Sequence, residues 1–309
     1  MMSHAEVFLC VNAWRMSFFL MSCWRREIIC TVQTKQGDDI MPSTYAHYRF
    51  GRDVYKKLPD DIKRIIYDER RLFLIGLHGP DILFYYKPLG NNRVNKIGYG
   101  MHDRSAREFF EQALEILEKE REKNTDAMMS YMYGFICHYA LDHACHTYVE
   151  EKIHESGVPH AEIEVEFDRM LMVSDGLDPI SQTLTDHIST DMRSASVINK
   201  FFPELETEDV QKALESMIFY NNLLVAPGNI KRGLIYALLF LSGNYKEMHG
   251  LIVNKKQNPL CADSNEKLMS LYEAAVPCCV SDIMHFANVF ECGRNKLDER
   301  FDHTFGAEE

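Results

Sequence analysis

A predicted central helix carries a row of side chains that bind metal ions well. His138, Asp142 and His146 are spaced four residues apart, which places them at about 0°, 40° and 80° around a helix. Burying two imidazoles and a carboxylate on an otherwise apolar helix is costly unless a partner satisfies them. Neutral imidazole and carboxylate are good zinc ligands, so this row predicts a metal site. A hydrogen-bonded His–Asp pair without a metal is the alternative interpretation.

A second pair follows on the next predicted helix. His160 and Glu164 are again four residues apart, and they come directly after the break at residues 157–159 (Gly-Val-Pro). Because this break lets the chain turn back, we expect the pair to reach the same cleft. Asp168 lies one turn further along, where it either orients a ligand imidazole or belongs to a solvated acidic face.

Three isolated candidates lie upstream, namely His47, Asp81 and His102. Each of them, taken singly, is more typical of a surface or capping residue than of a metal ligand. His78 lies close to Asp81, and we rank it lower because histidines are common in loops. Cys145 falls on the ligand face, but a buried cysteine more often acts as a small hydrophobic residue, so we leave it out.

These residues in this order resemble the zinc-dependent phospholipase C family, whose relatives include the single-strand-specific zinc nucleases. The family pattern has an early His, an Asp and a His from a loop region, H-x-x-x-D-x5-H, and H-x-x-x-E. The matching positions are His47, Asp81, His102, His138, Asp142, His146, His160 and Glu164. The resemblance covers residues 41–170. The H-x-x-x-E ending is similar to the phospholipase branch, since the nucleases end in H-x-x-x-D.

The resemblance implies an all-α fold around two or three Zn2+ ions. One ion would be held by Asp81, His102, His138 and Asp142, and Asp142 would bridge to a second ion held by His47. The third ion would be held by the remaining ligands, His146, His160 and Glu164. Three zinc ions and three carboxylates would leave a charge of about +3 facing a phosphate.

The same resemblance implies in-line hydrolysis of a phosphodiester by an activated water. Asp81 would be the candidate general base, and the substrate a phospholipid or another small phosphodiester. This sequence departs from the family in the spacing Asp142-x3-His146, where the family has D-x5-H, so the third metal position can shift. The family also uses its processed N-terminal residue as a ligand; here that ligand is absent unless the mature chain begins near Met41.

The secondary-structure elements that would position these residues are predicted to be helical nearly throughout after Met41. Amphipathic or apolar spacing predicts helices over residues 44–57, 60–75, 105–123, 126–153, 160–173, 208–225, 229–241 and 265–290. The stretch 76–100 is rich in Gly, Pro and Asn and is predicted to be a long loop. The predicted fold is therefore all-α, with one domain over residues 41–309.

Residues 1–40 differ in composition from the rest of the chain. They contain both tryptophans and an apolar patch over residues 7–24. Arginines follow this patch instead of preceding it, which is the wrong order for a secretory signal. We expect an extension outside the fold, with a weak membrane anchor as the alternative.

The composition and net charge disfavour some classes of binding partner. The 309 residues carry 34 Lys and Arg against 46 Asp and Glu, a net charge of −12, which argues against nucleic acid and against a general attraction to anionic membranes. No run is apolar enough to predict a spanning helix. Nine cysteines without a disulfide pattern favour a reducing compartment, so we expect a cytoplasmic protein. The sequence does not predict its oligomeric state.

Three alternatives to a phospholipase C-like enzyme stay open. A zinc nuclease of the same fold is disfavoured by the negative charge and by Glu164. An HD-type phosphohydrolase would need an adjacent His-Asp pair, whereas Asp142 and His143 are in the reverse order. A helical scaffold stabilised by metal, without catalysis, is the third.

Overall fold

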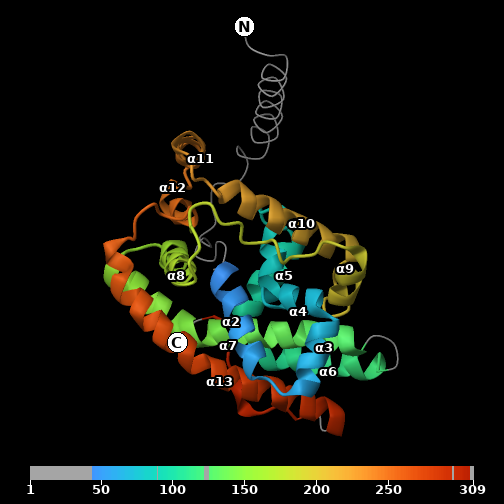
Figure 1. Cartoon of the computed structure of the whole chain (residues 1–309). Coiled ribbons are helices and arrows are strands. Elements are labelled where there is room, and N and C mark those ends of the chain that lie inside the picture. The colour runs from blue at the N-terminus through green and yellow to red at the C-terminus, as the bar shows by residue number, and fades with distance from the viewer. Residues whose placement is uncertain (1–43, 89, 122–124, 294–295, 307–309) are drawn as a thin grey trace. The chain divides into compact units, whose positions relative to one another are not determined.

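The computed structural model describes residues 44–88, 90–121, 125–293 and 296–306. Within these ranges the chain forms α-helices and short 3-10 helices, and no strand, which confirms the predicted all-α class (Figure 1). The α-helices are α2 (Thr44–Lys57), α3 (Asp60–Asp68), α4 (Arg70–Gly76), α5 (Arg93–His102), α6 (Ala106–Lys119), α7 (Thr125–Ser156), α8 (His160–Ser174), α9 (Met192–Asn199), α10 (Thr207–Leu224), α11 (Asn229–Leu241), α12 (Tyr245–Met248) and α13 (Ala262–Cys292). The 3-10 helices are η1 (Gly79–Tyr85), η2 (His249–Leu251), η3 (Pro259–Cys261) and η4 (Glu299–Phe301).

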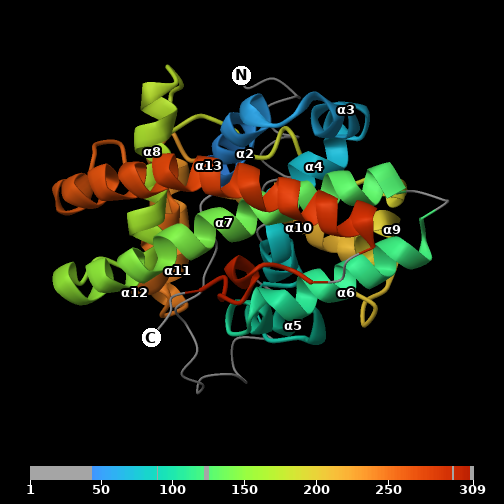
Figure 2. The ribbon, with the colours of Figure 1, turned by 90° about the horizontal axis from the view of Figure 1, so that it is seen from below.

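The long helix α7 is the centre of the described structure. Its first half is buried on all sides, from Ala127 to Asp142, as a stretch that is apolar nearly all round predicts. It packs against α2, α3, α4, α6 and α9, and α13 runs beside it (Figure 2). Since α7 also carries three of the predicted ligands, its neighbours determine what can reach them.

The predicted loop over residues 76–100 is wrong. The structure forms η1 and α5 there and leaves only a short connection between them. The residues that suggested a loop have other roles: Pro80 opens η1, and Asn92 caps α5 by accepting hydrogen bonds from the backbone N–H groups of Val94 and Asn95. Gly98 lies inside α5, where an added Cβ would come within 2.9 Å of the Phe84 ring.

Two further differences concern helix boundaries. The predicted helix over residues 60–75 is divided at Glu69, whose φ of −114° and ψ of 38° separate α3 from α4. Helix α9 was not predicted; it begins where the Asp191 side chain accepts a hydrogen bond from the Ser194 N–H. The proposed extension, residues 1–40, lies outside the described residues.

No single described helix has the length and apolar character of a membrane span. Helices α10 and α11 satisfy that test only when taken together, and they are bent by 116° relative to one another.

Candidate metal centre

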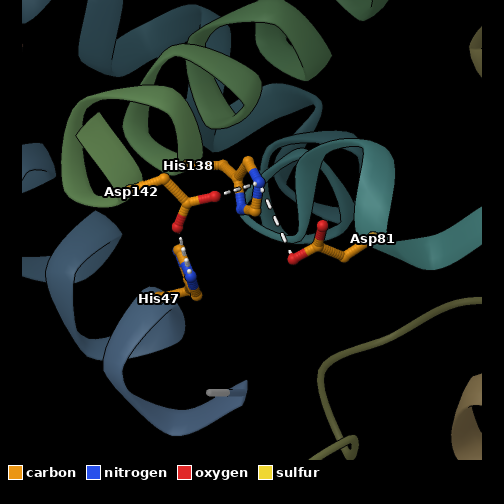
Figure 3. A group of neighbouring side chains, drawn as sticks. All are labelled: His47, Asp81, His138 and Asp142. Atoms are coloured by element: carbon orange, nitrogen blue, oxygen red, sulfur yellow. Dashed lines mark ion pairs between the residues drawn. The ribbon is translucent and has the colours of Figure 1, made fainter. Parts of the chain in front are cut away.

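The structure brings the eight predicted residues together from five segments. Its first group joins His47 of α2, Asp81 of η1, and His138 and Asp142 of α7 (Figure 3). All four are buried, and one potential ligand atom from each lies within 4.8 Å of the others. The two oxygens of Asp142 point in different directions, one 3.2 Å from His47 Nε2 and the other 3.0 Å from His138 Nε2. Asp142 is therefore placed to bridge two positions.

His102, the last residue of α5, extends this first group. Its Nε2 lies 3.1 Å from an oxygen of Asp81 and 3.6 Å from an oxygen of Asp142. Its other ring nitrogen, Nδ1, lies 3.1 Å from the carbonyl oxygen of Gly98. If Nδ1 carries the proton and donates to that carbonyl, the lone pair of Nε2 faces the two carboxylates, as in many metal sites.

The second group consists of His146, His160 and Glu164, again with potential ligand atoms within 4.8 Å of one another. An oxygen of Glu164 lies 3.1 Å from His160 Nε2 and 3.5 Å from His146 Nε2. His146 also lies 3.8 Å from an oxygen of Asp142, so the two groups adjoin. Because α7 continues unbroken to Ser156, His146 points from the helix itself, as its x3 spacing from Asp142 predicts.

Glu150 is a neighbour of this second group that the sequence analysis missed. Its carboxylate lies 3.3 Å from Nδ1 of His160, on the side of the ring opposite Glu164, and can orient that imidazole. The signal was present in the sequence, because Glu150 continues the four-residue spacing of His138, Asp142 and His146.

The polar atoms of the first group lack the hydrogen bonds that buried atoms normally have. Both carboxylate oxygens of Asp81 and both ring nitrogens of His138 are buried without a hydrogen-bond partner among the described residues. The close approach of His138 to Asp142 lacks hydrogen-bond geometry, since an Asp142 oxygen is unsatisfied as well. Lone pairs that converge without hydrogens between them fit a cation, and imidazole with carboxylate suits zinc.

The electrostatics of both groups follow from these carboxylates. Burial lowers the pKa of His102, but Asp142 and Asp81 outweigh it and hold the pKa well above its usual value. Burial also opposes charge on His160, and Glu164 with Glu150 raises its pKa to about 10. The pKa of Asp142 lies well below its usual value, because the surrounding histidines outweigh the effect of burial. Without a metal, the raised pKa values of His102 and His160 favour their cationic forms as partners of the carboxylates.

Asp168 does not belong to a solvated acidic face, which was one of the two roles considered from the sequence, because it is only 2% exposed. Its two oxygens accept hydrogen bonds from the backbone N–H groups of Tyr45 (2.9 Å) and Ala46 (2.7 Å). Asp168 thus holds the first turn of α2, directly before His47.

His78 lies beside the first group without joining either one. It is buried, and its Nε2 is 2.8 Å from Nε2 of His187, a residue that the sequence did not suggest. The His187 ring also stacks on Tyr48, with ring centroids 4.4 Å apart. Burial is the main cause of the lowered pKa values of His78 and His187, and it lowers the pKa of His187 to about 4. The two rings are therefore neutral, and one donates a hydrogen bond to the other.

A pocket opens on the α2–α8 side of these groups. Its polar lining includes Thr44 of α2, Asp168 of α8, Asn221 of α10 and Arg232 of α11. It therefore shares with the two groups the helices that carry His47 and Glu164.

The comparisons with known proteins give one family. A family model described as zinc dependent phospholipase C matches residues 46–216, which is more than half of the chain and includes all eight residues. No curated protein and no solved structure matches the chain.

Proposed function

Because the chain belongs to the zinc-dependent phospholipase C family, we propose that it hydrolyses the phosphodiester bond of a phospholipid. The observation that carries the proposal is the convergence of buried, unsatisfied oxygen and nitrogen atoms of Asp81, His138 and Asp142. Such an arrangement is costly in a purely structural core. It is expected where a cation and a phosphate are to be bound.

Each of the two groups would bind its own zinc ion or ions. The first group, with His102 added, would hold one or two Zn2+ ions across Asp142, and His146, His160 and Glu164 would hold another. Zinc ions bound there would supply a Lewis acid and lower the pKa of a bound water. The carboxylates of Asp81, Asp142 and Glu164 would offset only part of the zinc charge, so the site would stay positive toward a phosphodiester.

The chain's own residues would contribute orientation and proton transfer. Asp81, 1% exposed, presents two oxygens without hydrogen bonds, and we assign it the role of accepting a proton from the attacking water. Glu150 would fix the ring of His160, and the Gly98 carbonyl would fix that of His102.

The proposed class of substrate is argued from the net charge of the protein. A net charge of −12 repels polynucleotides, whereas a zwitterionic phospholipid or a small diester is not excluded from the site. This favours the phospholipase branch over the nuclease branch.

The test compares substrates on protein loaded with zinc. Phosphatidylcholine dispersed in detergent and bis(p-nitrophenyl) phosphate should be cleaved, cleavage should stop with a chelator, and added zinc should restore it. His138→Ala should lose activity, whereas His154→Ala, at an exposed position on the same helix, should keep it. Faster cleavage of single-stranded DNA than of either substrate would indicate a nuclease. Zinc that stabilises the fold without any turnover would indicate a scaffold.

A further inference from the structure

Helix α11 has its apolar side turned toward solvent. Ile230, Leu234, Leu238 and Leu241 are 83%, 62%, 45% and 80% exposed, and their spacing places them within about 80° of one another around the helix. We call these four residues the α11 stripe. Leu239, on the opposite side, is the one residue of α11 that is buried. A surface helix normally has the reverse arrangement, and an exposed apolar patch of this kind is typical of an interaction surface.

The chain around this stripe has the opposite charge to the protein as a whole. Residues 216–262 contain five lysines and arginines and one glutamate, a net charge of +4 in a chain of −12. Among the side chains that the structure describes, which do not include Glu247, no ion pair joins any of the five cations to a carboxylate. Lys231 donates to the backbone carbonyls of Asn222 and Val225, and Lys255 to the side chain of Asn229. The four exposed lysines, Lys231, Lys246, Lys255 and Lys256, are therefore available to an anionic partner beside the stripe.

The protein-facing side of α11 contributes to the pocket described above. Arg232 lines it together with Thr44 of α2 and Asp168 of α8, and the buried Nε of Arg232 has no hydrogen-bond partner among the described residues. Helix α11 lies beside α12 at the edge of the described structure (Figure 1). One helix thus separates the pocket from whatever covers the α11 stripe.

We propose that α11 docks this protein on the surface of a phospholipid bilayer. The stripe would enter the boundary between headgroups and acyl chains, with the neighbouring cations at the level of the lipid phosphates. The 13 residues of α11 extend only about 20 Å, which is too short to cross the hydrocarbon core. The proposal rests on the proposed function, because a bilayer is then also the source of the phospholipid substrate.

A second copy of the chain fits this surface less well. Two copies that met through their stripes would bring the same unpaired cations together, and like charges at an interface are unfavourable. A bilayer instead offers phosphate groups to the cations and an apolar layer to the leucines.

The experiment measures binding of the full, zinc-loaded chain to vesicles of phosphatidylcholine mixed with phosphatidylglycerol, by sedimentation. Leu234→Glu with Leu238→Glu should weaken binding at least about tenfold, since each leucine leaves the apolar layer. The matched control, Tyr67→Glu with Val173→Glu, changes two exposed apolar residues on α3 and α8 and should bind as the wild type does. Lys246→Gln with Lys256→Gln should also weaken binding, which gives a second test that leaves the stripe intact.

Turnover is measured separately on soluble bis(p-nitrophenyl) phosphate, which needs no docking and should be unaffected by these variants. A protein that binds vesicles through α11 but cleaves no diester would contradict the proposed function alone. Unchanged vesicle binding by both the leucine and the lysine variants would overturn the docking proposal. So would a leucine variant that changes the protein from dimer to monomer and binds vesicles as before, because the stripe would then be a contact between copies.

Discussion

Replacing Asp168 by Ala should destabilise the protein and weaken the metal site through the start of α2. The carboxylate is 2% exposed and accepts hydrogen bonds from the N–H groups of Tyr45 and Ala46. An alanine leaves both N–H groups buried without an acceptor, at about 1–3 kcal/mol each. The interaction of the negative charge with the positive end of the helix dipole is lost as well.

The expected loss is about 3–5 kcal/mol, a large part of the stability of an ordinary domain. His47 directly follows Ala46, so a displaced first turn moves a proposed ligand of the first group. The second group, His146, His160 and Glu164, lies on α7 and α8 and includes no residue of α2. Asp168→Ala should therefore lower zinc occupancy in part and not completely.

The assay combines urea unfolding, followed by circular dichroism, with zinc content measured by mass spectrometry. Asp168→Asn is the control, because its amide oxygen can still accept one of the two hydrogen bonds, and it should lose roughly half as much stability. A loss below about 0.5 kcal/mol for Asp168→Ala, within the range of ordinary surface substitutions, would refute the role assigned to Asp168. Full zinc occupancy in a destabilised variant would refute the link to His47.

Three further predictions concern the metal centre and the chain boundary. Asp142→Asn keeps the shape but loses the charge and a bridging oxygen, so hydrolysis should fall at least about 100-fold with helicity retained; wild-type zinc content and turnover would contradict the assignment. In chelator-treated protein, the His160–Glu164 ion pair should stabilise fully below the usual histidine pKa of 6.5 and be lost as pH rises toward about 10, so the melting temperature should fall across that range; a flat profile would contradict it. A chain that begins at Met41 should keep its fold and its activity, and loss of zinc on truncation would place residues 1–40 inside the domain.

Local patterns in the sequence predict the main helices well. Helix α11 has its predicted bounds, and α7 and α8 are separated at the predicted break, because these features depend on spacing and on Gly-Val-Pro at 157–159. Residues 76–100 were misjudged because the same residue types that form loops also cap helices and allow close packing, and only the tertiary neighbour distinguishes the two. The eight residues of α9 are too few to show a period, and its start depends on the cap by Asp191.

The residues of the candidate site also fall into those that local spacing predicts and those that depend on tertiary packing. The row on α7 and the pair on α8 can be found from spacing alone, because residues four apart on a helix share a face. The approach of His47, Asp81 and His102 to that row depends on how α2, η1 and α5 pack against α7, which no local pattern contains. The contact of Asp168 with the start of α2 joins residues 122 and 123 positions apart and is invisible to the sequence for the same reason.

The imidazole of His138 is confined between two neighbours. An added Cβ on Gly79 would come within 2.1 Å of that ring, and the ring of His47 stacks on it with centroids 4.5 Å apart. A ring held on both sides has little rotamer freedom left to lose when it binds an ion, which favours affinity by a fraction of about 1 kcal/mol. The same confinement prevents the ring from retreating before a larger ion. The position of His138 should therefore make the centre selective by ionic radius, accepting Zn2+ or Co2+ and excluding Ca2+, whose bonds to its ligands are longer.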